Sequence, residues 1–119
     1  MSYRLIQADS SLELAKGNVI FLGGSSRGND WRESFYQEFN NNVGLTFISP
    51  FRSKYSNPET HPKEHAETVA WEREAISMSK IAVFWLGSGL SNQAARVEIG
   101  YALGAGKTVI VGAGDEFLG

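Results

Sequence analysis

The chain has 119 residues, of which 42% are hydrophobic and 20% are charged. A chain of this length buries enough surface for one hydrophobic core and too little for two, so we expect a single domain over residues 1–119. It contains no cysteine, which excludes disulfides and cysteine-ligated zinc, and its net charge of −2 argues against a nucleic-acid polymer or an anionic membrane as partner.

Short apolar runs alternate along the chain with longer stretches of helical periodicity. Strands are expected at Val19–Leu22, at the weaker run Leu45–Ile48, at Ile81–Leu86 and at Thr108–Val111, with Tyr3–Ile6 as the candidate for an added edge strand. Helices are expected at about Asp30–Asn41, Lys63–Ser79 and Asn92–Gly106. Apolar strands joined by helices are typical of a parallel sheet covered on both faces. The pattern predicts an α/β fold: a single Rossmann-like (flavodoxin-like) three-layer domain with a four- to five-stranded, mainly parallel sheet.

A long loop is expected at Ser49–Pro62, which contains all three prolines of the chain. It follows the second predicted strand. Long loops at the carboxyl edge of a parallel sheet usually contribute to the ligand site, so we expect this loop to lie beside one.

A glycine-rich turn follows the first predicted strand and contains Gly24, Ser25, Ser26, Arg27 and Gly28. Backbone N–H groups in such a turn can converge on an anion, and the two serines and the arginine add side-chain donors. The turn is neither a Walker A loop nor a dinucleotide fingerprint, and glycines that only satisfy a tight turn explain it about equally well. Its place at the carboxyl end of a strand favours a phosphate or sugar-hydroxyl site.

Glu98 is the first candidate for a catalytic group. At roughly 100° per residue, the apolar and aromatic side chains expected around it on one helix face are Ala94, Val97, Tyr101, Ala102 and Ala105. Most helical glutamates are solvated, but a carboxylate on an apolar face must be hydrogen-bonded, paired or protonated.

Glu72 is the second candidate, at the margin of the apolar stripe of its predicted helix. From the residues alone, a boundary salt bridge with Arg73 or Lys80 is the favoured explanation. His61 and His65 have a spacing that can ligate metal, but a proline stands between them and no third ligand is near. We therefore expect no metal site and no cofactor.

Residues 19–113 resemble the nucleoside 2-deoxyribosyltransferase-like family, which includes transferases and nucleotide N-glycoside hydrolases. Three stretches carry the resemblance: VIFLGGSSRGNDW, VAWEREAISMSKIAVFWLG and VEIGYALGAGKTVIVG. The last is the most specific, because the family's nucleophilic glutamate lies in an E-[LI]-G-x-A-x-x-x-G-K context. Glu98 to Lys107 fits that context.

The resemblance implies an enzyme that cleaves the N-glycosidic bond of a (deoxy)nucleoside or nucleoside 5′-monophosphate, as a hydrolase or a base-exchanging deoxyribosyltransferase. Glu98 would form a covalent glycosyl intermediate, and Glu72 would hold a sugar hydroxyl or exchange a proton with the departing base. The Gly24 turn would hold the 5′ end of the substrate, and Ser91, Asn92 and Tyr101 complete the expected binding residues. The aromatic side chains available to stack on the base are Phe21, Phe51, Tyr55 and Trp85.

Two further features bear on assembly and chemistry. Transferases of the family commonly have an aspartate after the third predicted strand, where residues 86–90 contain no acid, and this departure bears on base protonation. Relatives complete a neighbour's site with a C-terminal region that this chain lacks after Gly119, and an uncovered sheet edge favours association, so we expect a homo-oligomer.

A cytoplasmic location is expected as well. The longest apolar run, Ile81–Leu86, is far shorter than the roughly 20 residues needed to cross a bilayer. The N-terminus is polar where a signal peptide would be apolar.

Two other functions are consistent with the same fold. One is a non-catalytic nucleotide-binding or sensing module, and the other is a small α/β interaction protein without a ligand. Arg27 beside the serines favours phosphate recognition over the interaction protein. A buried Glu98 favours catalysis over the binding module, because a pure binder gains little from a costly buried acid.

Overall fold

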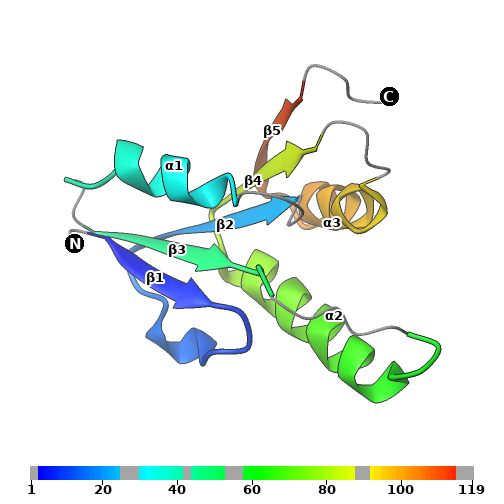
Figure 1. The fold of residues 1–119 in the computed structure, drawn as a ribbon. Coiled ribbons are helices and arrows are strands. Elements are labelled where there is room, and N and C mark those ends of the chain that lie inside the picture. The colour runs from blue at the N-terminus through cyan, green and yellow to red at the C-terminus, as the bar shows by residue number, and fades with distance from the viewer. Residues whose placement is uncertain (1–2, 25–29, 42–43, 53–57, 88–91, 115–119) are drawn as a thin grey trace.

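A computed structural model describes residues 3–24, 30–41, 44–52, 58–87 and 92–114. Its centre is a five-stranded, entirely parallel sheet in the order β1-β3-β2-β4-β5 (Figure 1). The strands are β1 (Arg4–Gln7), β2 (Asn18–Gly24), β3 (Leu45–Ser49), β4 (Ile81–Leu86) and β5 (Thr108–Ala113). The predicted α/β, Rossmann-like class is confirmed, and the candidate edge strand near the N-terminus is β1, paired with β3.

The helices are α1 (Arg32–Glu38), α2 (Pro62–Met78) and α3 (Gln93–Gly104), and a short 3-10 helix covers Leu12–Leu14. The predictions for α2 and α3 are correct to within two residues at each end. The prediction for α1 was too long, because the helix ends at Glu38. Asn40 and Asn41 follow, and asparagine competes with helical hydrogen bonding through its own side chain.

Two hydrophobic clusters pack on opposite faces of the sheet and give the domain its three layers. One face is covered by α2 and α3, whose Ala75, Ile76 and Ala102 pack with the buried Phe21 and Phe84. The other face is covered by α1, whose aromatic side chains pack on sheet residues; the cluster includes Trp31, Phe35, Tyr36, Phe39, Leu22 and Phe47. Figure 1 shows α1 on one side of the sheet and the other two helices on the opposite side. No helix in the described part of the chain is both long and apolar enough to cross a membrane.

The carboxyl end of β2 leaves no room for a side chain beside β4. Gly24 has a φ of 109°, and a Cβ at this position would overlap the backbone oxygen of Trp85. Gly24 pairs with Trp85 in the sheet. Any side chain at position 24 would therefore push the two strands apart, so the glycine is required by this close approach.

Candidate active site

The carboxyl edge of the sheet brings together residues that are distant in sequence. Because all strands are parallel, Asp9 after β1, Gly24 at the end of β2 and Arg52 after β3 lie at the same edge. Glu72 of α2 and Glu98 of α3 face each other beside it. We refer to Glu72 and Glu98 as the carboxyl pair.

Glu98 lies on the buried face of α3, as predicted, but its predicted neighbours were mostly wrong. Ala95 and Ala102 are buried, whereas Ala94 and Ala105 are exposed and Val97 is 65% exposed. The buried face follows positions 95, 98, 99 and 102, which is the ordinary spacing of a helix packed on a sheet. The many small residues of α3 give a weak amphipathic pattern, and this allowed the wrong helical phase.

The environment of Glu98 favours its protonated form. Its Oε2 atom is buried and has no hydrogen-bond partner among the described residues. Burial raises the pKa of Glu98 to about 9; the charge of Glu72 and a hydrogen bond with it act in the same direction, and the charges of Arg32 and Arg52 oppose them. At neutral pH Glu98 therefore carries a proton.

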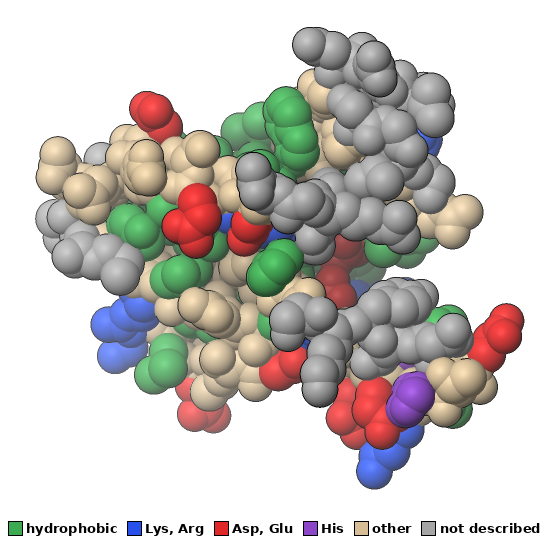
Figure 2. All heavy atoms as spheres, viewed as in Figure 1, with side chains coloured by type: hydrophobic (Ala, Val, Ile, Leu, Met, Phe, Trp, Pro, Cys, Tyr) green, Lys and Arg blue, Asp and Glu red, His purple; other side chains and the backbone are tan. Residues whose placement is uncertain are grey.

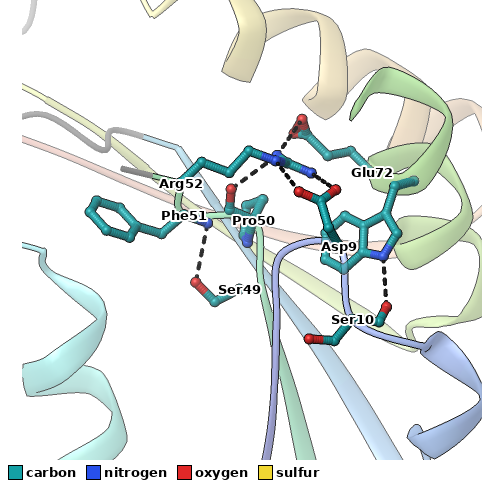
Figure 3. Close-up of polar contacts among 8 residues, drawn as sticks. Asp9, Ser10, Ser49, Pro50, Phe51, Arg52 and Glu72 are labelled. Carbon is teal, nitrogen blue, oxygen red and sulfur yellow. Dashed lines mark hydrogen bonds and ion pairs between the residues drawn. The ribbon is translucent and has the colours of Figure 1, made fainter. Parts of the chain in front are cut away.

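Arg52 connects the carboxyl pair to the segment after β1 (Figure 3). Its Nε and Nη2 atoms donate to the two carboxylate oxygens of Asp9, at 3.0 and 2.8 Å. Its Nη1 atom donates to Glu72 Oε1 at 3.3 Å and to the Pro50 carbonyl at 3.2 Å. The hydrogen bonds from Arg52 to Asp9 lower the pKa of the Asp9 carboxyl. Glu72 does form a boundary salt bridge, but its partner is Arg52 rather than the predicted Arg73 or Lys80.

Trp71 adds a second connection between α2 and the N-terminal segment. Its indole Nε1 donates to the Ser10 carbonyl at 3.0 Å, and the Arg52 guanidinium lies 5.4 Å from the ring centroid. The ring therefore stacks on the arginine that contacts Glu72, and the loop, α2 and the N-terminal segment are held together at one point.

A second arginine, Arg32, supports the end of β2. Its side chain is fully buried, and its Nε atom donates to the Leu22 carbonyl at 2.7 Å. Its Nη1 atom donates to Asp30 at 2.8 Å, and Nη2 lies 3.5 Å from the Gly24 carbonyl. The sequence carries little signal for this role, because a cation at a helix N-terminus is unfavourable to the helix dipole and normally indicates a solvated side chain.

The structure places the other predicted binding residues as follows. Gly24 is at the carboxyl edge, while Ser25, Ser26, Arg27, Gly28 and Ser91 lie outside the described residues. The Asn92 amide exchanges two hydrogen bonds of 3.1 Å with the Gly87 backbone, which joins the end of β4 to the start of α3. Tyr101 is not brought to the carboxyl pair: its hydroxyl is 2.8 Å from Ser77 Oγ, and Arg73 stacks on its ring.

Only some of the aromatic candidates for base stacking are accessible. The expectation for Phe21 was wrong, because this ring is fully buried in the core. Phe51 and Trp85 are partly exposed, at 36% and 37%. Tyr55 lies outside the described residues.

The raised pKa of Glu98 predicts a specific stability difference. In the unfolded chain this carboxyl ionises near 4.5, so above that pH folding must retain a proton that the unfolded state releases. Glu98→Gln removes this cost. We expect its free energy of unfolding to exceed that of the parent by an amount that grows by about 1.4 kcal/mol per pH unit as pH rises from near 5 towards 8. Urea unfolding of both proteins across this range measures it; a constant difference would show that native Glu98 is ionised.

The described residues contain no group of three or more histidine and acidic side chains placed to hold a metal ion.

A family model described as "Nucleoside 2-deoxyribosyltransferase like" matches residues 17–117. No curated protein matches the chain. The matched range includes both members of the carboxyl pair and Arg52, and excludes β1 and Asp9.

Proposed function

The chain belongs to the nucleoside 2-deoxyribosyltransferase-like family, and we propose that it cleaves the N-glycosidic bond of a (deoxy)nucleoside or nucleoside 5′-monophosphate. The observation that supports this proposal is the carboxyl pair at the carboxyl edge of the sheet. The Glu98 carboxyl interacts with Glu72, and its Oε2 atom is buried without a hydrogen-bond partner among the described residues. Ligands of open parallel sheets bind at this edge.

In the first step, Glu98 acts as the nucleophile. Its proton passes through Glu72 to the departing base, the bond between C1′ and the base nitrogen breaks, and Glu98 forms an ester with C1′. Positive charge develops on the sugar as this bond breaks, and it stabilises the newly ionised carboxylate. This step yields the protonated free base and a glycosyl-enzyme.

In the second step, water or another base attacks C1′ on the face that the first base left. Glu72 accepts the attacking group's proton, the ester to Glu98 breaks, and the proton returns to the pair. Hydrolysis and base exchange differ only in the acceptor, and both proceed with net retention at C1′. In this scheme the carboxyl pair supplies the proton that an aspartate after the third predicted strand supplies in transferases.

The substrate's 5′ end is assigned to the turn that begins at Gly24. Ser25, Ser26, Arg27 and Gly28 would supply donors to a 5′-hydroxyl or 5′-phosphate, and Ser91 and Asn92 remain the other proposed binding residues. The buried Arg32 below the turn, which contacts the Leu22 and Gly24 carbonyls, supports this assignment by fixing the end of β2.

A cytoplasmic homo-oligomer remains part of the proposal. Figure 2 shows hydrophobic side chains at the surface in the region of β4 and β5. Trp85 of β4 and Ile110 of β5 are exposed hydrophobic residues, and Ile110 is 53% exposed. β5 is also an edge strand of the sheet. An uncovered edge beside an apolar surface favours association with a second copy.

The test is release of free base. The protein is incubated with ribo- and deoxyribonucleosides and their 5′-monophosphates, with and without a second free base, and products are separated by chromatography. We expect release without an added base if the enzyme is a hydrolase, and a new nucleoside when a base is added if it is a transferase. Binding of a nucleotide without either product would favour the non-catalytic sensing module.

A further inference from the structure

The segment after β1 is the one part of the site that lies outside the range matched by the family, residues 17–117. It is fixed to the matched part at several points. β1 pairs with β3, the Ser10 carbonyl accepts from Trp71, and Asp9 accepts two hydrogen bonds from Arg52. This segment is therefore built into the site and does not simply extend the sheet.

Asp9 has a backbone conformation that favours glycine, with a φ of 65°. An aspartate there is tolerated but costs stability relative to glycine. Its carboxylate is 64% exposed, and Figure 3 shows it turned towards the Arg52 guanidinium. The arrangement indicates that the position requires the carboxylate and not only the turn.

Arg52 has every guanidinium nitrogen engaged. Two nitrogens bind Asp9, and the third reaches Glu72 and Pro50. Its side chain is only 17% exposed and that of Glu72 only 19%, so their charges interact through a partly desolvated contact. The two carboxylates of Asp9 and Glu72 thus hold one cation between them.

We propose that Arg52, held in place by Asp9, is a positioning residue that fixes the Glu72 carboxylate beside Glu98 and keeps a positive charge next to the carboxyl pair. This inference rests on the proposed function, because it assigns Glu72 as the group that later accepts the proton. Among the described residues, the charged groups that act on Glu98 besides Glu72 are Arg32 of α1 and Arg52 after β3, and Asp9 after β1 contacts Arg52.

The test is the pH dependence of kcat for base release. Activity falls at low pH once both carboxyls are protonated, and removing the cation next to the pair makes this protonation easier. For Arg52→Met we expect the acidic limb to move upward by about one pH unit or more. An unmoved limb in this variant would overturn the inference.

Asp9→Asn distinguishes two possible effects of Asp9: fixing the position of Arg52, and acting on the carboxyl pair as a nearby negative charge. If Asp9 acts only as a nearby negative charge, its removal moves the acidic limb to lower pH. If Asp9 holds Arg52 against Glu72, its loss frees the cation and moves the limb upward. We expect an upward shift smaller than that of Arg52→Met, and a downward shift or none would contradict the assigned role of Asp9. Glu13→Gln, which neutralises an exposed acid of the same segment, is the matched control and should leave the profile unchanged.

A second readout does not depend on activity. With carboxyl-labelled glutamate, the carbon-13 signal that disappears in Glu72→Gln reports ionisation of the pair. The pH midpoint of this signal should rise in Arg52→Met, and it should rise by a smaller amount in Asp9→Asn. A rise without any base release would uphold this inference while the proposed function fails. Unchanged midpoints together with full base release would overturn the inference and leave the proposed function standing.

Discussion

Glu98→Gln is expected to lower the rate of base release by about three orders of magnitude or more, because an amide cannot form the glycosyl ester. Glutamine has nearly the size and hydrogen-bonding capacity of a protonated glutamate, which is the form that the buried site favours. The variant should therefore fold and still bind substrate. Initial rates of base release at saturating substrate provide the measurement.

The matched control is Glu74→Gln, which makes the same change on the exposed side of α2. It should retain the parent's rate. Glu98→Gln with a rate close to that of Glu74→Gln would remove Glu98 from the reaction. Loss of activity in Glu98→Gln with unchanged stability at neutral pH would show that Glu98 is needed but is not buried as a protonated acid.

The second large effect concerns stability. Gly24→Ala should lower the free energy of unfolding by about 3 kcal/mol, because the new methyl group overlaps the Trp85 backbone and alanine is strained at a φ of 109°. Urea unfolding followed by tryptophan fluorescence measures the change. The control is Gly100→Ala, where a methyl group would enter open space within α3. That change should raise stability by about 0.5–1 kcal/mol.

Comparing the two variants shows whether a glycine is required by the backbone geometry at position 24 or whether any glycine-to-alanine change has the same effect on stability. If Gly24→Ala proved as stable as the parent, β2 and β4 would not approach each other as described, and the end of β2 would be free to adopt another geometry. Equal losses in both variants would indicate that any added side chain is harmful, which the open surroundings of Gly100 do not predict.

Most of the fold follows from the sequence because its strands are apolar on both faces. Val19–Leu22 and Ile81–Leu86 stand out against the helical periodicity between them, and each became a strand of the sheet. The 3-10 helix at Leu12–Leu14 was not predicted, because three residues are too few to show a period. The order of the strands also required the structure, since local pattern does not say that β1 pairs with β3.

The site was only partly predictable for a different reason. Glu98 was predicted because a carboxylate in an apolar helix is anomalous and its surrounding motif resembles a family. Arg52 and Asp9 are ordinary charged residues in loops, 43 positions apart, and only the folded sheet brings them together. The one available signal for Arg52 was its place in the proline-containing loop after the second predicted strand.

The carboxyl pair also changes the significance of the acid missing after β4. The resemblance to the family makes its absence a departure from the transferases that bears on base protonation. In the fold, burial and the neighbouring Glu72 raise the pKa of Glu98 to about 9, and the charges of Arg32 and Arg52 oppose this rise. The proposed reaction takes its proton from this carboxyl. A separate donor is then unnecessary for the proposed reaction.

The most direct test of the account is to trap the intermediate. The protein is mixed with a substrate that releases base, quenched in acid within milliseconds to seconds, and digested for mass spectrometry. The account predicts a glycosyl adduct on the peptide that contains Glu98, absent from Glu98→Gln and lost when water or an acceptor base is given time to react. Base release accompanied by an adduct on a different residue, or by none at any quench time, would contradict it.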